Sequence, residues 1–432
     1  MKTPSSAPKI ALLGPFGYGN LGDAAIQQAM LENIYQYVPN AVVFGVSMNP
    51  PDTEKRHGIP AFPIGRFAPG WGLNKPPFRS WFHHWLYHLR KEAPSAVRKI
   101  VKVVFWLPTE IIGFLEGFAF LKDVDLLVVS GGGQLDDYWG GAWHHPYTLM
   151  MWGFLARLRN VPNKFISVGT GTLDSRLSRL FERIALSLAS YRSYRDEKSK
   201  NYIANVTGFN RDDPVYPDLA FSLHGIENLV SAGGGELQSS NTQWSVAIGP
   251  LPYFDPRIWP QKDRRIYTNY LNKLAELVGW LLEIHCQVVF IPGEMIQDRA
   301  VINDLKALFS QSGLDVATKI SYPLIQTVDE LLSYLASADF VIASRFHNVL
   351  LAQLLQKPVI ALSYHAKIDE LMADTGQADY CLQISDFDLE MIKARFSELE
   401  ANRETACQQI AQRVEQYRAA LDEQYQRIFG NY

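Results

Sequence analysis

The segment Ser344-Arg345-Phe346-His347-Asn348 holds the side chains best suited to chemistry in this chain. It follows the apolar run Phe340–Ala343 and opens a helical pattern near 347–356, so Arg345 and His347 are expected where a strand ends and a helix begins. The planar fork of an arginine fits a carboxylate or a phosphate. A histidine exchanges a proton near neutral pH. The alternative for His347 is a capping or packing role, which a single histidine often has.

A second cation follows the next apolar run along the chain. Tyr364-His365-Ala366-Lys367 comes directly after Val359–Leu362. Ligands of open α/β sheets bind at the carboxyl ends of the strands, so Lys367 is expected near the same anion as Arg345. The alternative is a solvated surface lysine.

A glycine-rich turn at residues 14–23, GPFGYGNLGD, lies between the apolar run Lys9–Leu13 and a helical pattern expected from Asp23 to Tyr37. Glycines let the backbone approach a ligand, and free N–H groups at a helix start favour an anion. A tight turn with Asp23 as the helix N-cap explains the pattern equally well. The spacing is not that of a dinucleotide fingerprint.

Two further polar segments follow apolar runs. SGGGQLD at 130–136 comes after Leu126–Val129, and its three glycines indicate positive φ angles or close approach of a ligand. Arg195-Asp196-Glu197-Lys198-Ser199 comes after Tyr191–Tyr194. Acids suit the positive end of a helix dipole, whereas an arginine there is disfavoured, so Arg195 is the better candidate for a ligand contact.

Positioning these segments requires parallel sheets. Apolar runs alternate with helical patterns along the chain, which predicts an α/β fold. The remaining strand candidates are Ala41–Val46, Lys164–Val168, Ser245–Ile248 and Gln287–Ile291. Further helical patterns lie near 266–285, 299–311 and 329–337.

The domain organisation follows from length and composition. A chain of 432 residues is too long for one compact core. We expect an N-terminal α/β domain at 1–228, a Gly- and Ser-rich linker at 229–243, a C-terminal α/β domain at 244–385, and a helical tail at 386–432. Two Rossmann-like domains facing a cleft form a GT-B-like architecture. The alternative is a single large doubly wound domain with an insertion.

Residues 66–121 do not fit this plan. Residues 67–102 carry seven Lys or Arg against one acid, Glu92, and are interleaved with aromatic side chains. The apolar stretch that follows is interrupted by Lys102, Glu110 and Glu116, and a central charge in a bilayer costs about 3 kcal/mol, so a spanning helix is disfavoured. The pattern fits contact with a membrane surface. The alternative is a packed helical insertion whose basic face is solvated.

Charge and cysteines bound the environment. A net charge of -3 provides no general attraction to nucleic acid. Cys286, Cys381 and Cys407 are far apart and show no metal-ligand spacing, so we expect neither a disulfide framework nor a metal site. The N-terminal run resembles a first strand more than a signal peptide, and we expect a cytoplasmic protein that could be peripheral on the inner face of the membrane.

The ordered set of motifs resembles the polysaccharide pyruvyl transferase family. The positions that carry the resemblance run in order from about residue 10 to 376: Gly19, Asn20, Gly22, Asp23, Gly131 to Gly133, Arg195, Asp196, Glu197, Ser199, Pro217, Asp218, Arg345, His347, Pro358, Val359, Tyr364 and Lys367. The chain departs from the family pattern at Ala24, where many members have Glu, and at Thr170-Gly171-Thr172, where Gly-Pro is common.

The resemblance implies a GT-B-like fold, phosphoenolpyruvate as the donor substrate, no metal or other cofactor, and a glycan or lipid-linked saccharide as the acceptor. It also implies that the N-terminal domain (1–228) lies on the acceptor side and the C-terminal domain (244–385) on the donor side. On this basis His347 is expected to be the acid–base group, with Asp23 orienting or deprotonating the acceptor hydroxyl. The expected substrate-binding residues are Arg195, Arg345, Lys367, Asn20, Gly22, Gly132, Gly133 and Tyr364.

Two other functions remain as alternatives. A GT-B nucleotide-sugar glycosyltransferase would carry a Glu about seven residues before Pro358 to hold the ribose, but this chain has Leu351 there. A non-catalytic membrane-surface scaffold of the same fold would explain the basic aromatic insertion and Ala24 but not the retained Arg345 and His347.

Overall fold

The chain folds into two compact units. The computed structural model describes residues 7–65, 108, 110–138, 140–233, 244–311, 319–430 and 432. Unit 1 comprises Met1–Tyr18, Asn33–Leu219 and Gln424–Tyr432, and unit 2 comprises Gly19–Glu32 and Ala220–Glu423. Each unit has its own six-stranded sheet, so the two predicted Rossmann-like domains form and the alternative of a single large doubly wound domain with an insertion is wrong.

Unit 1 has the strand order β3-β2-β1-β4-β5-β6, with parallel pairing throughout. The strands are β1 (Lys9–Leu13), β2 (Val42–Ser47), β3 (Ala61–Pro63), β4 (Leu126–Ser130), β5 (Asn163–Val168) and β6 (Tyr191–Tyr194). The chain order reverses between β1 and β4. In doubly wound sheets the carboxyl ends of two such strands flank the ligand site.

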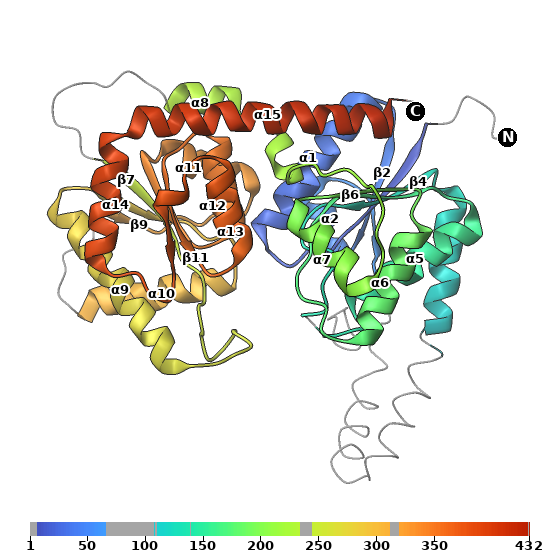
Figure 1. Cartoon of the computed structure of the whole chain (residues 1–432), viewed down its shortest axis with the longest axis horizontal. Coiled ribbons are helices and arrows are strands. Elements are labelled where there is room, and N and C mark those ends of the chain that lie inside the picture. Colours follow the sequence, from blue (N-terminus) through green and yellow to red (C-terminus); the bar gives the residue numbers. More distant parts are fainter. Residues whose placement is uncertain are drawn as a thin grey trace, which may run out of the picture. The chain divides into compact units, whose positions relative to one another are not determined.

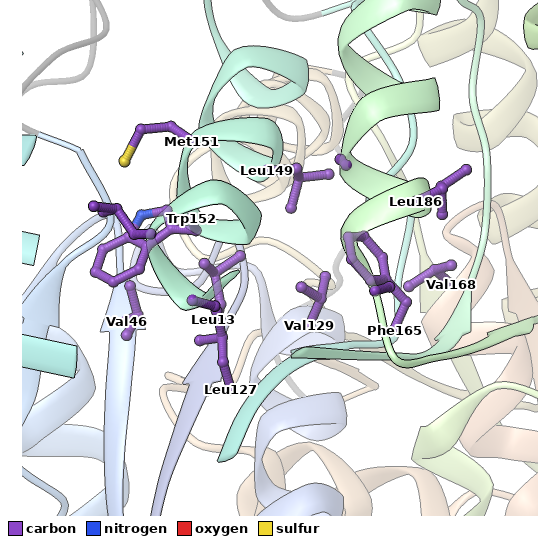
Figure 2. Packing of buried hydrophobic residues seen from close by; sticks show 14 of the residues in the cluster. Leu13, Val46, Leu127, Val129, Leu149, Met151, Trp152, Phe165, Val168 and Leu186 are labelled. Carbon is purple, nitrogen blue, oxygen red and sulfur yellow. The ribbon is translucent and has the colours of Figure 1, made fainter. Parts of the chain in front are cut away.

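The core of unit 1 forms where α5 (His145–Arg159) and α6 (Arg176–Leu188) cover one face of this sheet (Figure 2). Alternate strand residues such as Leu127 and Val129 point toward the helices, into the cluster that also contains Trp152 and Leu149. The other helices of unit 1 are α2 (Pro50–His57), α7 (Glu197–Thr207) and the 3₁₀ turn Leu121–Asp123, and residues 110–120 are also helical. The 3₁₀ turn Leu219–Ser222 lies where the chain passes from unit 1 into unit 2.

Unit 2 repeats the doubly wound plan with the order β12-β11-β10-β7-β8-β9. Its strands are β7 (Ser245–Gly249), β8 (Gln287–Phe290), β9 (Ile320–Ser321), β10 (Phe340–Ala343), β11 (Val359–Ser363) and β12 (Cys381–Gln383). The chain order reverses between β7 and β10, so the loops after these two strands are neighbours.

Helices cover both faces of the sheet of unit 2. In Figure 1, α9 and α14 lie on one face, and α12 and α13 lie on the other. The helices are α8 (Glu227–Gly233), α9 (Arg264–Glu283), α10 (Gln297–Gln311), α11 (Val328–Ser337), α12 (Phe346–Leu354), α13 (Ala366–Asp374), the 3₁₀ turn Ala378–Tyr380, α14 (Leu389–Ala401) and α15 (Arg403–Phe429).

The units interleave along the chain, unlike the expected division into 1–228 and 244–385. Helix α1 (Leu21–Tyr37) starts in unit 2 and ends in unit 1. The expected tail is helical, and its end belongs to unit 1, where the buried Gln424 hydrogen-bonds the side chains of Ser193 and Ser167. Most of the expected linker 229–243 and of the insertion 66–121 lies outside the described residues.

Candidate functional site

Arg345 and His347 lie where the sequence predicts them, at the end of β10 and the start of α12. Arg345 is the N-cap residue of α12, with an extended backbone (φ -81°, ψ 132°), and His347 lies in the first turn. The amide of Ser344 donates to the carbonyl of Gly249 at the end of β7 (2.9 Å). Arg345 and His347 therefore lie beside the point where the strand order of this sheet reverses, between β7 and β10. A helix start at such a point favours an anion.

Asp298, in the first turn of α10, holds Arg345 in place. The Arg345 Nε donates to both carboxylate oxygens (3.0 and 3.1 Å), and Nη2 donates to Oδ1 (2.5 Å). Asp298 is fully buried, and its Oδ2 also accepts the amides of Gly293 and Glu294 (2.8 Å each). Burial lowers the pKa of Arg345, but Asp298 and, after it, Tyr364 and Glu294 raise it to a net value above the usual range. Arg345 is therefore a fixed cation whose Nη1 takes no part in these hydrogen bonds.

His347 packs directly on the glycine turn of the N-terminal segment. A Cβ atom at Gly22 would lie 2.0 Å from His347 Nδ1 and 2.3 Å from Cγ. No side chain fits there, so Gly22 allows the imidazole to lie against the first turn of α1. This contact lies within unit 2, because residues 19–32 belong to that unit and not to the N-terminal domain expected for them.

Asn20, and not Asp23, caps α1. The Asn20 Oδ1 accepts the amides of Gly22 (3.0 Å) and Asp23 (3.4 Å), so the N-cap role considered for Asp23 is wrong. Asp23 lies one residue beyond Gly22, in the first turn. Asn20 thus has a structural function that holds Gly22 beside His347.

The turn after β8 completes this arrangement. Leu21 N donates to the Gly293 carbonyl and Met295 N donates to the Gly19 carbonyl, both at 2.9 Å. Glu294 accepts the amides of Ile296 and Gln297, and burial raises the pKa of its carboxyl above the usual value. The glycine turn of the N-terminal segment is therefore tied by backbone hydrogen bonds to the turn that Asp298 organises.

Tyr364 directly follows the neighbouring strand β11, and Lys367 lies in the first turn of α13, which comes next. Strand β11 pairs with β10, and Lys367 Nζ lies 5.4 Å from the ring centroid of Phe346, next to Arg345. The structure therefore brings Lys367, Arg345 and His347 to one edge of unit 2, together with Asn20, Gly22 and Asp23.

The other expected residues, Gly132, Gly133 and Arg195, form a second group in unit 1. Gly131 and Gly132 have positive φ angles (46° and 68°), as expected for a glycine turn. The amide of Gly169, after β5, donates to the Gly132 carbonyl (2.7 Å). A Cβ at Gly169 would lie 2.7 Å from the Arg195 guanidinium carbon, so the absence of a side chain at Gly169 lets the Arg195 guanidinium pack against the backbone there.

Arg195 is paired with carboxylates. Its Nε lies 3.3 Å from Asp196 and its Nη1 lies 3.6 Å from Asp218, and only 8% of its side chain is exposed. Asp196 also caps α7 through the amide of Ser199 (2.6 Å), and the Ser199 hydroxyl accepts the amide of Thr170 (3.2 Å). Four positions of the resemblance motifs thus form one network. Arg195 is far less available to a ligand than the sequence suggests.

Unit 1 also contains a cluster of acidic side chains, Glu182, Asp136 and Asp137, that the sequence motifs did not predict as a site. Glu182 on α6 is fully buried, and neither of its carboxylate oxygens has a hydrogen-bond partner among the residues that the structure describes. Burial, with the negative charges of Asp136 and Asp137, raises its pKa well above the usual value. Asp137 accepts hydrogen bonds from the amides of Asp174 and Ser175 and from the hydroxyl of Ser178, which is one turn before Glu182.

Sequence reasoning missed Asp298 and Glu182. An acid in the first turn of a helix is common, so Asp298 carries no local signal that distinguishes it. Glu182 lies within an ordinary amphipathic helix pattern. Within the described ranges, His, Cys, Asp and Glu side chains do not gather in groups of three that could hold a metal ion. No helix among the described residues has the length and apolar character needed to cross a bilayer.

Solved structures share this fold. A putative UDP-N-acetylglucosamine 2-epimerase from Listeria monocytogenes is 12% identical, with a TM-score of 0.57 and 98% of each chain covered. The UDP-GlcNAc 2-epimerase from Neisseria meningitidis, solved with UDP-GlcNAc, is 12% identical, with a TM-score of 0.53, 93% of this chain and 94% of that chain covered. Together with the two parallel sheets, these neighbours confirm the GT-B-like α/β fold.

The sequence also matches a family. None of the curated protein sequences compared with this chain matches it. A sequence model of the polysaccharide pyruvyl transferases matches residues 20–366, a range that begins at the capping residue Asn20 and extends past Tyr364. The chain therefore belongs to the polysaccharide pyruvyl transferase family, a family of transferases.

Proposed function

We propose that this protein transfers the pyruvyl group of phosphoenolpyruvate to two hydroxyl groups of a saccharide, forming a ketal and releasing phosphate. The observation that carries the proposal is the group formed by Arg345, His347 and Lys367 at the switch-point edge of unit 2. Two cations and a helix start suit a small ligand with both a carboxylate and a phosphate. The histidine lies within the same group, against Gly22.

The chemistry assigns a task to each group. A proton from protonated His347 adds to the methylene carbon of phosphoenolpyruvate, and the adjacent carbon becomes an oxocarbenium centre. The first sugar hydroxyl bonds to this carbon and loses its proton to a base, for which Asp23 is the candidate. The C–O bond to phosphate then breaks and phosphate leaves, which gives a second oxocarbenium centre. The second hydroxyl bonds to this carbon, loses its proton to the now neutral His347 and closes the ketal ring. Arg345 and Lys367 stabilise the departing phosphate electrostatically.

The donor is tested by thermal shift and phosphate release. Phosphoenolpyruvate should raise the Tm of the wild-type protein, because a ligand that binds only the folded state stabilises it. Arg345→Ala and Lys367→Ala should lose this shift, and the control Lys393→Ala, which removes a surface ion pair with Glu390, should keep it. A Tm shift with UDP-GlcNAc and none with phosphoenolpyruvate would instead establish a nucleotide-sugar enzyme.

The position of Leu351 supports the pyruvyl transferase over that rival. Its side chain, on α12, is fully buried. The residue that would have to contact a ribose is therefore apolar and inaccessible. The presence of Arg345 and Lys367 beside His347 argues against a scaffold without catalytic activity, which would not need these side chains.

We further propose that the protein works at an anionic membrane surface, where a lipid-linked acceptor would be found. The support comes from the basic composition of residues 67–102 and from the helical residues that follow. In that helix Ile111, Ile112 and Leu115 are 53%, 50% and 59% exposed, and Phe154 on the adjacent α5 is also exposed. In a flotation assay, the wild-type protein should float with vesicles that contain phosphatidylglycerol, and a variant with Asp at Ile111, Ile112 and Leu115 should not. Equal flotation of the two proteins would exclude this contact.

A further inference from the structure

The loop between β7 and α9, residues 250–263, is here called the aromatic loop. Its Trp259 makes an edge-to-face contact with Tyr364, which follows β11, at a centroid distance of 5.7 Å. In the strand order β11-β10-β7, strand β10 lies between the two strands that these loops follow. The aromatic loop must therefore pass the carboxyl end of β10, where Arg345 begins.

The aromatic loop is held firmly. Asp255 is fully buried and accepts hydrogen bonds from Nε (2.9 Å) and Nη2 (2.6 Å) of Arg257. Arg257 also bonds Asp304 on α10 (2.5 Å), and the amide of Trp259 donates to the Asp255 carbonyl (2.9 Å). These bonds fix the loop on the body of unit 2, so its side chains are already in place before a ligand binds.

Three aromatic rings of this loop form a cluster that is only partly buried. Tyr253 lies 4.8 Å from Phe254 and 5.8 Å from Trp259, and Phe254 stacks on Trp259 at 6.1 Å with an interplanar angle of 25°. Phe254 has a φ of 57°, a conformation that a bulky residue seldom adopts. The chain thus maintains an unfavourable backbone conformation and leaves apolar rings half-buried beside a cation group.

We propose that the aromatic loop is a subsite for the pyranose ring of the acceptor saccharide, with Trp259 as its main stacking residue. A pyranose has an apolar face of C–H groups and a polar rim of hydroxyls, so it suits an indole beside charged side chains. Phosphoenolpyruvate is small and charged, and it would use little of a cluster of three rings. The inference rests on the proposed function, since it assigns the acceptor to the edge that holds the proposed donor residues.

The test uses four p-nitrophenyl pyranosides as probes: the glucoside, galactoside, mannoside and N-acetylglucosaminide. Saturation-transfer NMR measures their binding directly, without turnover. Trp259→Ala should weaken binding of the best probe about tenfold, and Trp259→Phe should retain most of it, as expected for the loss of an aromatic contact. The control Trp280→Ala removes an indole at a separate hollow that Trp244 and Phe396 also line, and it should bind the probe like wild type.

A second readout separates this inference from the proposed function. The Tm shift with phosphoenolpyruvate should be the same in Trp259→Ala as in wild type. If the shift is lost, the loop binds the donor and the subsite assignment is wrong. It is also wrong if no probe binds the wild-type protein, or if Trp259→Ala binds the probe normally. An absent phosphoenolpyruvate shift in the wild type, with glycoside binding that depends on Trp259, would overturn the donor and keep the subsite.

Discussion

Gly22 and His347 are in direct contact, although they lie far apart in the sequence. A Cβ atom at Gly22 would lie 2.0 Å from the imidazole Nδ1, closer than any side chain can approach. The Asn20 cap and the backbone hydrogen bonds to the turn after β8 hold Gly22 at this point. The imidazole of His347 can therefore occupy this position only because residue 22 has no side chain.

His347→Ala should abolish turnover without unfolding the protein. Loss of a general acid–base group lowers kcat by about 100-fold or more. Phosphate release from phosphoenolpyruvate with an acceptor measures the loss, and a thermal melt checks the fold. Equal activity in the variant would remove His347 from the mechanism, and a parallel loss of the thermal transition would make it a structural residue.

Gly22→Ala should lower turnover by moving His347. The new methyl group must displace the imidazole. If this is its only effect, adding Gly22→Ala to the His347→Ala variant should lower turnover no further, because the effects of two residues that act as a unit do not add. The kinetics of the two single variants and the double variant measure this coupling.

The matched control for Gly22→Ala is Gly279→Ala on α9. Apart from the backbone of its own helix, a Cβ there would meet no atom of the described residues within 4 Å. The substitution should therefore leave activity unchanged and stabilise the helix by up to about 1 kcal/mol. Full additivity of Gly22→Ala and His347→Ala would show that the glycine acts by another route.

Asp298→Asn should destabilise the protein and weaken donor binding together. The substitution leaves the buried part of Arg345 without its carboxylate, and breaking such a buried pair costs about 3 kcal/mol. Chemical unfolding measures the stability, and the Tm shift with phosphoenolpyruvate measures the binding. The control Glu398→Gln, in a surface pair with Arg395, should change neither quantity. Normal donor binding in Asp298→Asn would show that the pair is not needed to position Arg345.

Glu182→Gln should change how stability depends on pH. Burial raises the pKa of Glu182 in the folded protein above its unfolded value, so between these two pKa values the folded state binds more protons. The contribution of Glu182 to the free energy of unfolding is present at acid pH. It falls by about 1.4 kcal/mol for each pH unit as the pH rises from the unfolded pKa to the folded pKa.

The measurement for Glu182 is a comparison of Tm between pH 4.5 and pH 8. Wild type should lose more Tm over this range than Glu182→Gln, which has no titrating group at this position. The exposed Glu390→Gln should follow wild type. Parallel curves for wild type and Glu182→Gln would mean that Glu182 is ionised in the fold at neutral pH.

Local pattern was sufficient for much of the fold. Strands β1, β6 and β10 have the predicted bounds, because each is a short apolar or aromatic run that ends at polar or glycine residues. Strands β3, β9 and β12 were not predicted. They contain three, two and three residues, which is too short for a periodic signal, and they form because each pairs with the edge of a sheet.

The sequence by itself determined an α/β fold with parallel strands, the turns at the strand ends and the residue types that those turns carry, because these features depend on neighbours in the chain. Tertiary structure alone decided that Asp298 pairs with Arg345, 47 residues away, and that Arg195 is neutralised by Asp218. It also decided that the glycine turn of α1 belongs with His347 and not with the rest of the N-terminal segment. Such contacts depend on strand order and on which segments complete each unit, and the periodicity of a sequence does not encode either.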